Sequence, residues 1–248
     1  MSADQRKRTG RRGFLGIAAA SAAGALVAPG IRLVEVAQAA TPSPGASPKV
    51  RWGMLIDTTK CASGCTDCVS ACNTENGLSG KTGPTDSQWI RVVALKEVKT
   101  GRSAQAPVMC QHCASPPCVD VCPTGASFKR ADGIVLVDKH ICIGCRYCVM
   151  ACPFAARSFV HEPLHDQKPD VPRGQGCVES CTLCVQRLDR GEKTTACAEA
   201  CAAAGHGAIV FGDLNDPDSE IAKRLREVRS VALRADLRLD TGVRYEGL

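Results

Sequence analysis

The sequence contains little bulky apolar material. Only 4% of its 248 residues are aromatic (two Trp, two Tyr and five Phe), whereas it has 23 Gly and 14 Pro. Aromatic side chains supply much of the area that ordinary protein cores bury, so side-chain packing alone is a weak source of organisation here. The chain also has 17 Cys, which predicts that disulfides or metal supply what the core lacks.

Several functional motifs are missing as well. There is no G-x-G-x-x-G turn, no C-x-x-C-H haem motif and no Ser/His/Asp arrangement, so neither a nucleotide cofactor nor a small-molecule substrate is expected. The net charge of +6 is concentrated at residues 1–39, and the remaining residues have 25 Lys and Arg against 23 Asp and Glu. This balance excludes a nucleic-acid partner. No stretch after residue 40 has the length or apolarity of a transmembrane helix.

The cysteines fall into four groups, with Cys177 left over. The groups are Cys61, Cys65, Cys68 and Cys72 (C-x3-C-x2-C-x3-C); Cys110, Cys113, Cys118 and Cys122 (C-x2-C-x4-C-x3-C); Cys142, Cys145, Cys148 and Cys152 (C-x2-C-x2-C-x3-C); and Cys181, Cys184, Cys197 and Cys201 (C-x2-C-x12-C-x3-C). The third spacing is that of bacterial [4Fe–4S] ferredoxins. Two alternatives fit less well. A framework of disulfides would not use an odd number of cysteines, and a zinc site does not require a third cysteine shortly after a C-x2-C pair. Four [4Fe–4S] clusters are therefore predicted.

Ferredoxin geometry predicts how the groups share clusters, because the fourth cysteine of a run points to the other cluster of a pair. The predicted sets are Cys110, Cys113 and Cys118 with Cys152; Cys142, Cys145 and Cys148 with Cys122; Cys61, Cys65 and Cys68 with Cys201; and Cys181, Cys184 and Cys197 with Cys72. Cys177 is interpreted as a spare thiol or as a substitute for Cys181. His112, inside a C-x-x-C pair, is interpreted as a cluster-facing side chain that hydrogen-bonds sulfur.

This pairing predicts an α+β, loop-rich fold of tandem, nested ferredoxin-like 2[4Fe–4S] modules. Between the inner groups, a turn at Asp132–Gly133 and an apolar run indicate a hairpin. A helix is expected from Ile221 to Val228, and the alternation after Val231 favours a strand. The predicted divisions are a signal peptide (1–39), the first part of the outer half (40–108), the inserted inner half (109–160), the second part of the outer half (161–212) and a C-terminal extension (213–248).

The N-terminal segment has the features of an export signal. Arg11 and Arg12 precede an apolar stretch from Phe14 to Ala28, and Ala37-Gln38-Ala39 forms an A-x-A cleavage site. The arginine pair resembles the twin-arginine motif; an ordinary secretory signal or an uncleaved anchor are the alternatives. A route for folded proteins would allow clusters to be inserted before the thiols meet an oxidising compartment. A periplasmic location is therefore expected.

The motifs CIGCRYCVMACPFAAR, CQHCASPPCVDVCPTGA and CTLCVQRLDRGEKTTACAEAC resemble the four-cluster electron-transfer subunits of the dimethyl sulfoxide reductase, polysulfide reductase and formate dehydrogenase type. The resemblance covers most of residues 50–220. It implies a line of four clusters that passes electrons between partner subunits without a substrate site of its own. Membership of a molybdopterin oxidoreductase or a polysulfide or nitrite reductase-type complex is one interpretation.

A narrower likeness lies in VRWGMLIDTTKC and GCTDCVSACNTENGL, which, with the leader, are similar to the periplasmic iron–sulfur subunits of the Dsr transmembrane complex of dissimilatory sulfur metabolism. That likeness implies three kinds of neighbour in a membrane-bound complex. They are a polytopic quinone-interacting membrane subunit, a multihaem cytochrome c, and further subunits that lead to sulfite chemistry. It also implies attachment to the membrane through those partners.

Overall fold

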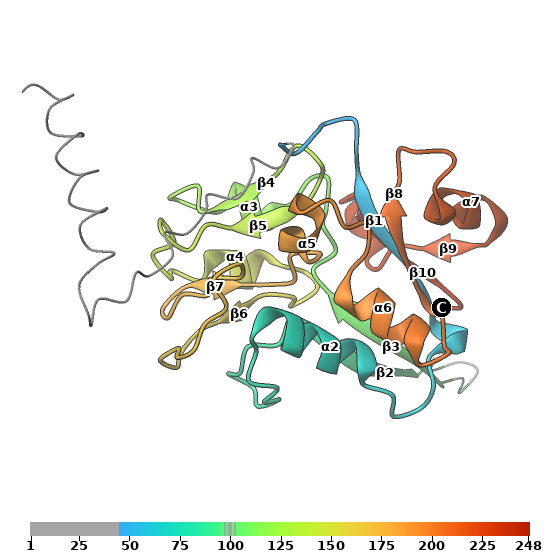
Figure 1. Cartoon of the computed structure of the whole chain (residues 1–248), viewed down its shortest axis with the longest axis horizontal. Coiled ribbons are helices and arrows are strands. Elements are labelled where there is room, and N and C mark those ends of the chain that lie inside the picture. The colour runs from blue at the N-terminus through green and yellow to red at the C-terminus, as the bar shows by residue number, and fades with distance from the viewer. Residues whose placement is uncertain (1–44, 97, 99–100, 102) are drawn as a thin grey trace, which may run out of the picture. The chain divides into compact units, whose positions relative to one another are not determined.

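The computed structural model describes residues 45–96, 98, 101 and 103–248 (Figure 1). The proposed export signal at residues 1–39 lies outside the described residues. Within the described ranges, no helix has both the length and the apolar character needed to cross a membrane.

A four-stranded mixed sheet joins distant parts of the chain, in the order β8-β1-β10-β9. Its central strand β1 (Trp52–Asp57) pairs antiparallel with β8 (Ile209–Asp213) and parallel with β10 (Val243–Glu246), which pairs antiparallel with β9 (Ser230–Val231). In Figure 1 the blue strand β1 lies beside the orange and red strands. Five of the six residues of β1 are buried, as expected of a strand covered on both faces.

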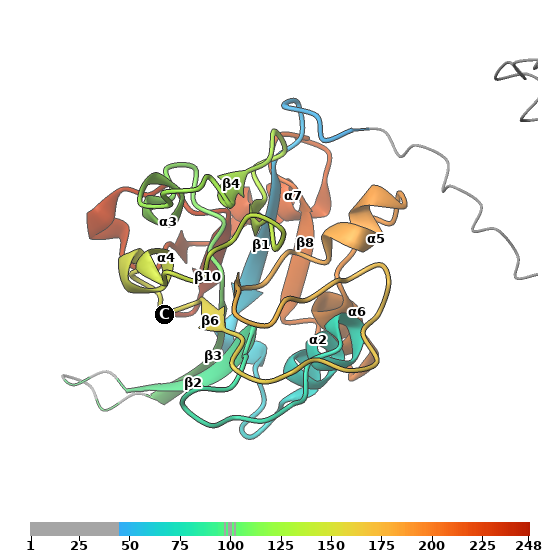
Figure 2. The ribbon, with the colours of Figure 1, turned by 90° about the vertical axis from the view of Figure 1, so that its left-hand side faces the viewer.

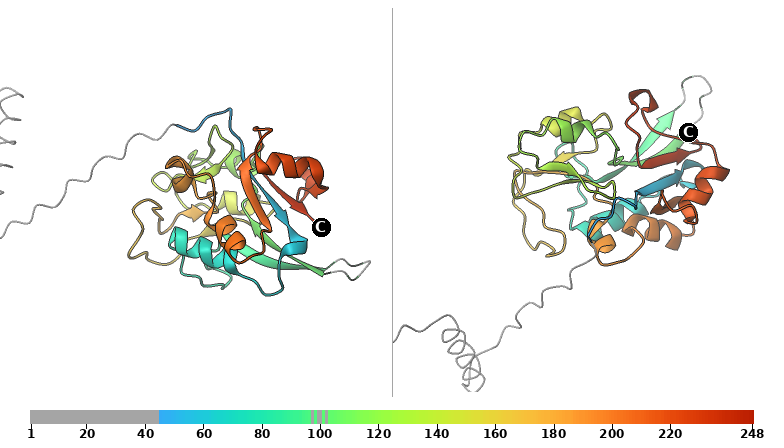
Figure 3. Two further views of the ribbon diagram at one scale, coloured as in Figure 1. Left: turned by 45° about the vertical axis from the view of Figure 1, so that its right-hand side comes forward. Right: turned by 90° about the horizontal axis from the view of Figure 1, so that it is seen from above.

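Helix α7 (Glu220–Glu227) packs against this sheet, beside β8 and β1 (Figure 3). The side chain of Ser219 caps the helix by accepting a hydrogen bond from the amide of Ala222, which satisfies one of the free donors of the first turn. Ile221 is fully buried. The helix predicted behind the acidic stretch is thereby confirmed.

Three antiparallel pairs of strands make up the other sheets. They are β2 (Ile90–Lys96) with β3 (Ser103–Met109), β4 (Ser127–Lys129) with β5 (Val135–Val137), and β6 (Ser158–Phe159) with β7 (Val178–Glu179). The second of them is the predicted hairpin between the inner cysteine groups. Gly133 lies in its turn at φ +86°, a conformation that glycine adopts without a steric penalty.

Five short helices carry or adjoin the cysteines: α2 (Asp67–Asn76), α3 (Pro117–Asp120), α4 (Tyr147–Ala151), α5 (Val185–Asp189) and α6 (Ala196–Ala203). Helices α2 and α6 lie side by side in both views of the molecule (Figure 1, Figure 2). Gly77 caps the C-terminal end of helix α2 and adopts a left-handed conformation (φ 64°). The mixture of short helices, small sheets and long loops confirms the α+β class.

The strand expected directly after Val231 is wrong over most of its length. The chain leaves β9 at Val231 and forms a short 3₁₀ helix at Ala235–Leu237, flanked by Arg234 and Arg238, each with a left-handed backbone (φ 51°). An extended run cannot pass through two such residues. The strand forms later, as β10, where Val243 and Tyr245 are fully buried beside β1.

Candidate iron–sulfur cluster sites

The first outer set consists of Cys61, Cys65, Cys68 and Cys201, which line one cavity. Cys61 follows the 3₁₀ helix after β1, Cys68 lies on α2 and Cys201 on α6. The pKa of the Cys68 thiol is raised to about 12, first by burial, then by the thiol of Cys197 in the other outer set, and then by those of Cys201, Cys65 and Cys61. Segments about 140 residues apart in the chain therefore bring these four sulfurs together.

Two further side chains stand at this cavity. The Asp67 carboxylate lies 3.4 Å from the Cys65 sulfur, and His206 also lines the cavity. Cys65, Asp67 and His206 present their ligand atoms within 4.8 Å of one another. The sequence patterns had singled out only the cysteine, because neither Asp67 nor His206 has a recognisable ligand spacing.

The second outer set consists of Cys72, Cys181, Cys184 and Cys197, all of them buried. Burial, and then the neighbouring thiols of Cys197 and Cys184, raise the pKa of the Cys72 thiol well above its usual value. The pKa of Cys181 is raised in the same way by burial and by Cys72. Cys72 thus lies with cysteines of the fourth group, although its neighbours in the sequence are those of the first.

The first inner set consists of Cys110, Cys113, Cys118 and Cys152. The pKa of the Cys113 thiol is raised to about 12 by burial and then by the thiols of Cys110, Cys118 and Cys152. Cys118 lies on α3, and Cys152 directly follows α4. These two helices pack against each other, which brings the last cysteine of the third group to the first three of the second.

The second inner set consists of Cys122, Cys142, Cys145 and Cys148, which line a further cavity. Cys145 is exposed, whereas Cys148 is buried. Burial would raise the pKa of Cys122, but hydrogen bonds from the Ser127 amide and from Thr124 outweigh it and lower that pKa. The Ser127 amide lies 3.3 Å from the Cys122 sulfur.

The donor sets fit iron–sulfur clusters. All seventeen cysteines lie within the described residues and none forms a disulfide. Crowding buried thiols four at a time raises their pKa values and disfavours thiolates, unless a metal takes the place of the protons. N–H groups also approach the sulfurs: the Ala208 amide donates to Cys201 at 3.3 Å, and the Asn76 side chain to Cys72 at 3.5 Å. Such donors tune iron–sulfur potentials.

Cys177 contacts the chain next to the second inner set. Its sulfur is 3.3 Å from the carbonyl oxygen of Lys139 and 3.8 Å from that of Cys142. Its pKa is raised by burial and then by Cys142. The leftover thiol is therefore placed beside the second inner set, whereas Cys181 belongs to the second outer set.

His112 is buried and neutral, because burial lowers its pKa to about 3. Its Nδ1 accepts a hydrogen bond from the Val135 amide at 3.0 Å, so the proton of the neutral ring is assigned to Nε2. That nitrogen has no partner among the described residues. Nε2 is thus the ring atom that remains to donate to a sulfur.

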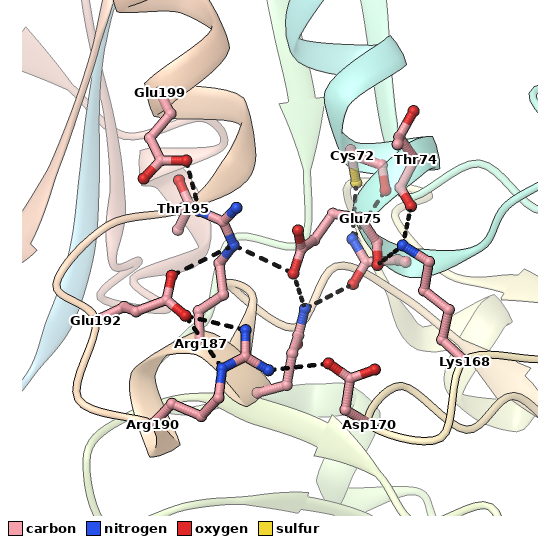
Figure 4. Close-up of polar contacts among 12 residues, drawn as sticks. Cys72, Thr74, Glu75, Lys168, Asp170, Arg187, Arg190, Glu192, Thr195 and Glu199 are labelled. Atoms are coloured by element: carbon pink, nitrogen blue, oxygen red, sulfur yellow. Dashed lines mark hydrogen bonds and ion pairs between the residues drawn. The ribbon is translucent and has the colours of Figure 1, made fainter.

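A polar network, which sequence patterns did not indicate, ties the helices of the second outer set together (Figure 4). The Gln186 side chain on α5 donates to Glu75 at 2.9 Å and to Asn76 at 3.4 Å, and Asn76 in turn donates to the carbonyl oxygen of Cys72 at 2.9 Å. Arg187 lies between Glu75 on α2, at 3.2 Å, and Glu199 on α6, at 2.6 Å. Three helices are therefore joined around Cys72.

Replacing Arg187 with methionine is expected to destabilise the helices around the second outer set. The Arg187 and Glu75 side chains are only 17% and 18% exposed, so the substitution leaves the partly buried Glu75 carboxylate without this cation. We expect the free energy of unfolding to fall by about 2–3 kcal/mol, somewhat less than for a fully buried pair. Denaturant titration followed by visible cluster absorption measures the change.

Arg190→Met is the matched control. Arg190 pairs with Asp170 and Glu192 in the same network, but its side chain is 50% exposed. Solvent screens such pairs, so its replacement should cost less than about 1 kcal/mol. Equal losses in the two variants would contradict a structural role specific to Arg187.

Comparison of this sequence with those of known proteins identifies the family to which the chain is related. A family model described as "4Fe-4S dicluster domain" matches residues 103–214. The chain is 42% identical to the Hdr-like menaquinol oxidoreductase iron-sulfur subunit 1 of Archaeoglobus fulgidus, over 96% of this chain and 98% of that protein. It is 41% identical to a subunit of the tetrathionate reductase of Salmonella typhimurium (81% of this chain, 74% of that one). It is 33% identical to the menaquinone reductase iron-sulfur cluster-binding subunit of Nitratidesulfovibrio vulgaris (79% and 89%).

Proposed function

This chain belongs to the family of ferredoxin-type [4Fe–4S] electron-transfer subunits of oxidoreductase complexes, and we propose that it is the periplasmic subunit of a membrane-bound respiratory complex linked to dissimilatory sulfur metabolism. The observation that carries the proposal is the gathering of sixteen cysteines, all but Cys145 buried or half-buried, into four sets of four. When bound, the clusters supply one-electron oxidation and reduction.

The proposed ligands are the four sets themselves, with three cysteines of one group completed by the last cysteine of another. On this assignment residues 109–160 form an inner ferredoxin-like half, inserted between residues 40–108 and 161–212 of an outer half. Residues 1–39 are the twin-arginine signal and residues 213–248 the C-terminal extension. The proximity of Cys72 to Cys197, and of Cys113 to Cys152, supports this nested assignment.

The chain's own residues contribute position, shielding and hydrogen bonds. The helix pairs α2–α6 and α3–α4 fix the distances between cysteines from different groups. Burial excludes water from most of the sulfurs, which limits the reorganisation that accompanies a change of charge. Electron transfer between clusters does not require a residue that binds a substrate. We propose that the chain has no substrate site of its own.

The proposed partners are a polytopic quinone-interacting membrane subunit, a multihaem cytochrome c and other subunits of the complex. Two relatives carry menaquinol or menaquinone in their names, which supports a quinone-linked neighbour. The alternative is the electron-transfer subunit of a molybdopterin, polysulfide or nitrite reductase-type complex, which the tetrathionate reductase relative favours. The match over 98% of the Archaeoglobus fulgidus protein, against 74% of the Salmonella typhimurium one, favours the first proposal.

The proposal predicts a metal content, a location and a set of companions. Membranes extracted anaerobically in mild detergent should yield the chain together with quinone-interacting and haem c subunits. Each chain should contain about sixteen iron atoms and as many acid-labile sulfides, four per cluster, with EPR signals after reduction. Replacing Arg11 and Arg12 with lysine should retain the chain in the cytoplasm, because the twin-arginine pair is the signal that the export route recognises.

The outcomes separate the parts of this proposal. Zinc in place of iron would contradict cluster binding. Recovery of an iron-loaded chain alone, from the soluble periplasmic fraction, would contradict the complex and leave a free electron carrier. Unchanged export of the lysine variant would contradict the twin-arginine route.

A further inference from the structure

Arg157 is a buried cation without a counter-ion of its own. It follows the loop after Cys152, directly before β6, and is 5% exposed. Among the described residues, none of its three guanidinium nitrogens makes a hydrogen bond of acceptable geometry, and none forms an ion pair with a carboxylate. A buried charge is costly unless an opposite charge compensates for it.

The groups around Arg157 come from both inner sets. The sulfurs of Cys118, Cys110 and Cys148 lie close enough to the Arg157 guanidinium to interact with it electrostatically. Cys148 is close enough to interact with the guanidinium directly, although not in regular hydrogen-bond geometry.

Cys110 and Cys118 belong to the first inner set, whereas Cys148 belongs to the second. Cys118 lies on α3 and Cys148 on α4, and these helices pack against each other, so the two sets adjoin. One side chain with a permanent charge is therefore close to both, in a place from which water is excluded. Charges interact much more strongly in such a place than at a hydrated surface.

We propose that Arg157 is a positioning residue that sets the reduction potentials of the two inner clusters together, by holding one unscreened positive charge beside both ligand sets. This inference rests on the proposed function and deepens it. Reduction adds one electron to a cluster, and no bond in the chain forms or breaks. The guanidinium keeps its proton in both states, so it favours each reduced, more negative form without itself reacting.

Arg146 provides a comparison within the same region. It lies on the loop of the second inner set, beside Cys145, and contacts the ring of Phe159 at 4.8 Å. Unlike Arg157 it is exposed, so water and ions screen its charge. If burial is what makes Arg157 effective, removal of the same charge at Arg146 must have a smaller effect.

EPR-monitored redox titration tests the proposal, with dithionite as the electron donor and mediators present. Cys113→Ser and Cys145→Ser variants identify the signals of the two inner clusters. In Arg157→Gln both inner clusters should become harder to reduce by at least about tenfold in the reduction equilibrium, or about 59 mV for a one-electron couple, with the outer pair unchanged. Arg157→Lys and Arg146→Gln should each stay within about threefold of wild type.

The number of clusters in the wild-type protein separates this inference from the proposed function. If the wild-type protein does not contain four clusters, both the proposed function and the inference are wrong. Four clusters with unchanged inner signals in Arg157→Gln overturn the inference alone, as does an equal shift in Arg146→Gln. If Arg157→Gln assembles no inner clusters, Arg157→Lys decides: inner clusters at wild-type potentials support a requirement for charge, and their absence overturns it.

Discussion

Serine in place of Cys72 is expected to remove the same cluster as serine in place of Cys197, and to leave the cluster of Cys61 intact. In the sequence Cys72 belongs to the group of Cys61, but its sulfur lies among those of the fourth group. A hydroxyl is a poor ligand for cluster iron compared with a thiolate, which iron–sulfur clusters use. Each variant should therefore contain about twelve of the sixteen irons and lack one and the same EPR signal.

This comparison is informative because the alternative gives the opposite result. If each sequence group held its own cluster, Cys72→Ser would abolish the signal that Cys61→Ser abolishes. Cys177→Ser is the matched control, since that sulfur faces the carbonyl oxygens of Lys139 and Cys142. It should retain all four signals, and loss of an inner cluster would show that the leftover thiol is a ligand.

The sequence indicates the iron–sulfur chemistry well because much of its signal is local. Three cysteines within a short loop must surround one cluster, so spacing alone indicates the chemistry. The hairpin β4–β5 was predictable for a similar reason, since its turn residues and apolar run are adjacent. The helix α7 also follows from its local pattern.

The strand near the C-terminus was misplaced because its position depends on a distant partner. The alternation after Val231 is a real local signal, but the place beside β1 is taken by β10. That pairing joins Met54 to Val243 and Ile56 to Tyr245, across almost the whole described chain. Burial of Tyr245, whose hydroxyl donates to the carbonyl oxygen of Pro107 at 3.0 Å, favours this arrangement over an extended run at Val231.

The residues that surround the sulfurs could not be assigned from spacing. Asn76 and Gln186 are ordinary polar residues of short helices, and only their meeting in space makes them a network. Arg157 offered a faint signal, as a lone charge in the otherwise mostly apolar run PFAARSFV. Buried charges need a compensating partner, so a cation placed soon after a cluster ligand is a feature to weigh in similar chains.

Removing the iron is expected to unfold most of the protein. Many of the buried positions that fill the core are cysteines, and helices α2 and α6 present Cys68, Cys72, Cys197 and Cys201 to it. Metal binding to a structural site contributes about 10–16 kcal/mol in small zinc domains, whereas a whole domain is stable by only about 5–15 kcal/mol. Treatment with an oxidant and a chelator, with the thiols then kept reduced, should therefore abolish cooperative thermal unfolding and much of the helical circular dichroism.

The sheet β8-β1-β10-β9, together with α7, is an internal control for the loss of structure after iron removal. It adds ordinary apolar packing, with Met54, Ile56, Ile221 and Tyr245 fully buried, although Met54, Ile56 and Tyr245 share one core with the cysteines. Hydrogen exchange of the iron-free chain should show remaining protection confined to β1, β10 and α7, and none in α2 or α6. An iron-free chain that unfolds cooperatively and protects α2 from exchange would refute this prediction. Such a result would mean that the thiols pack well enough by themselves and that the clusters do not contribute to the stability of the fold.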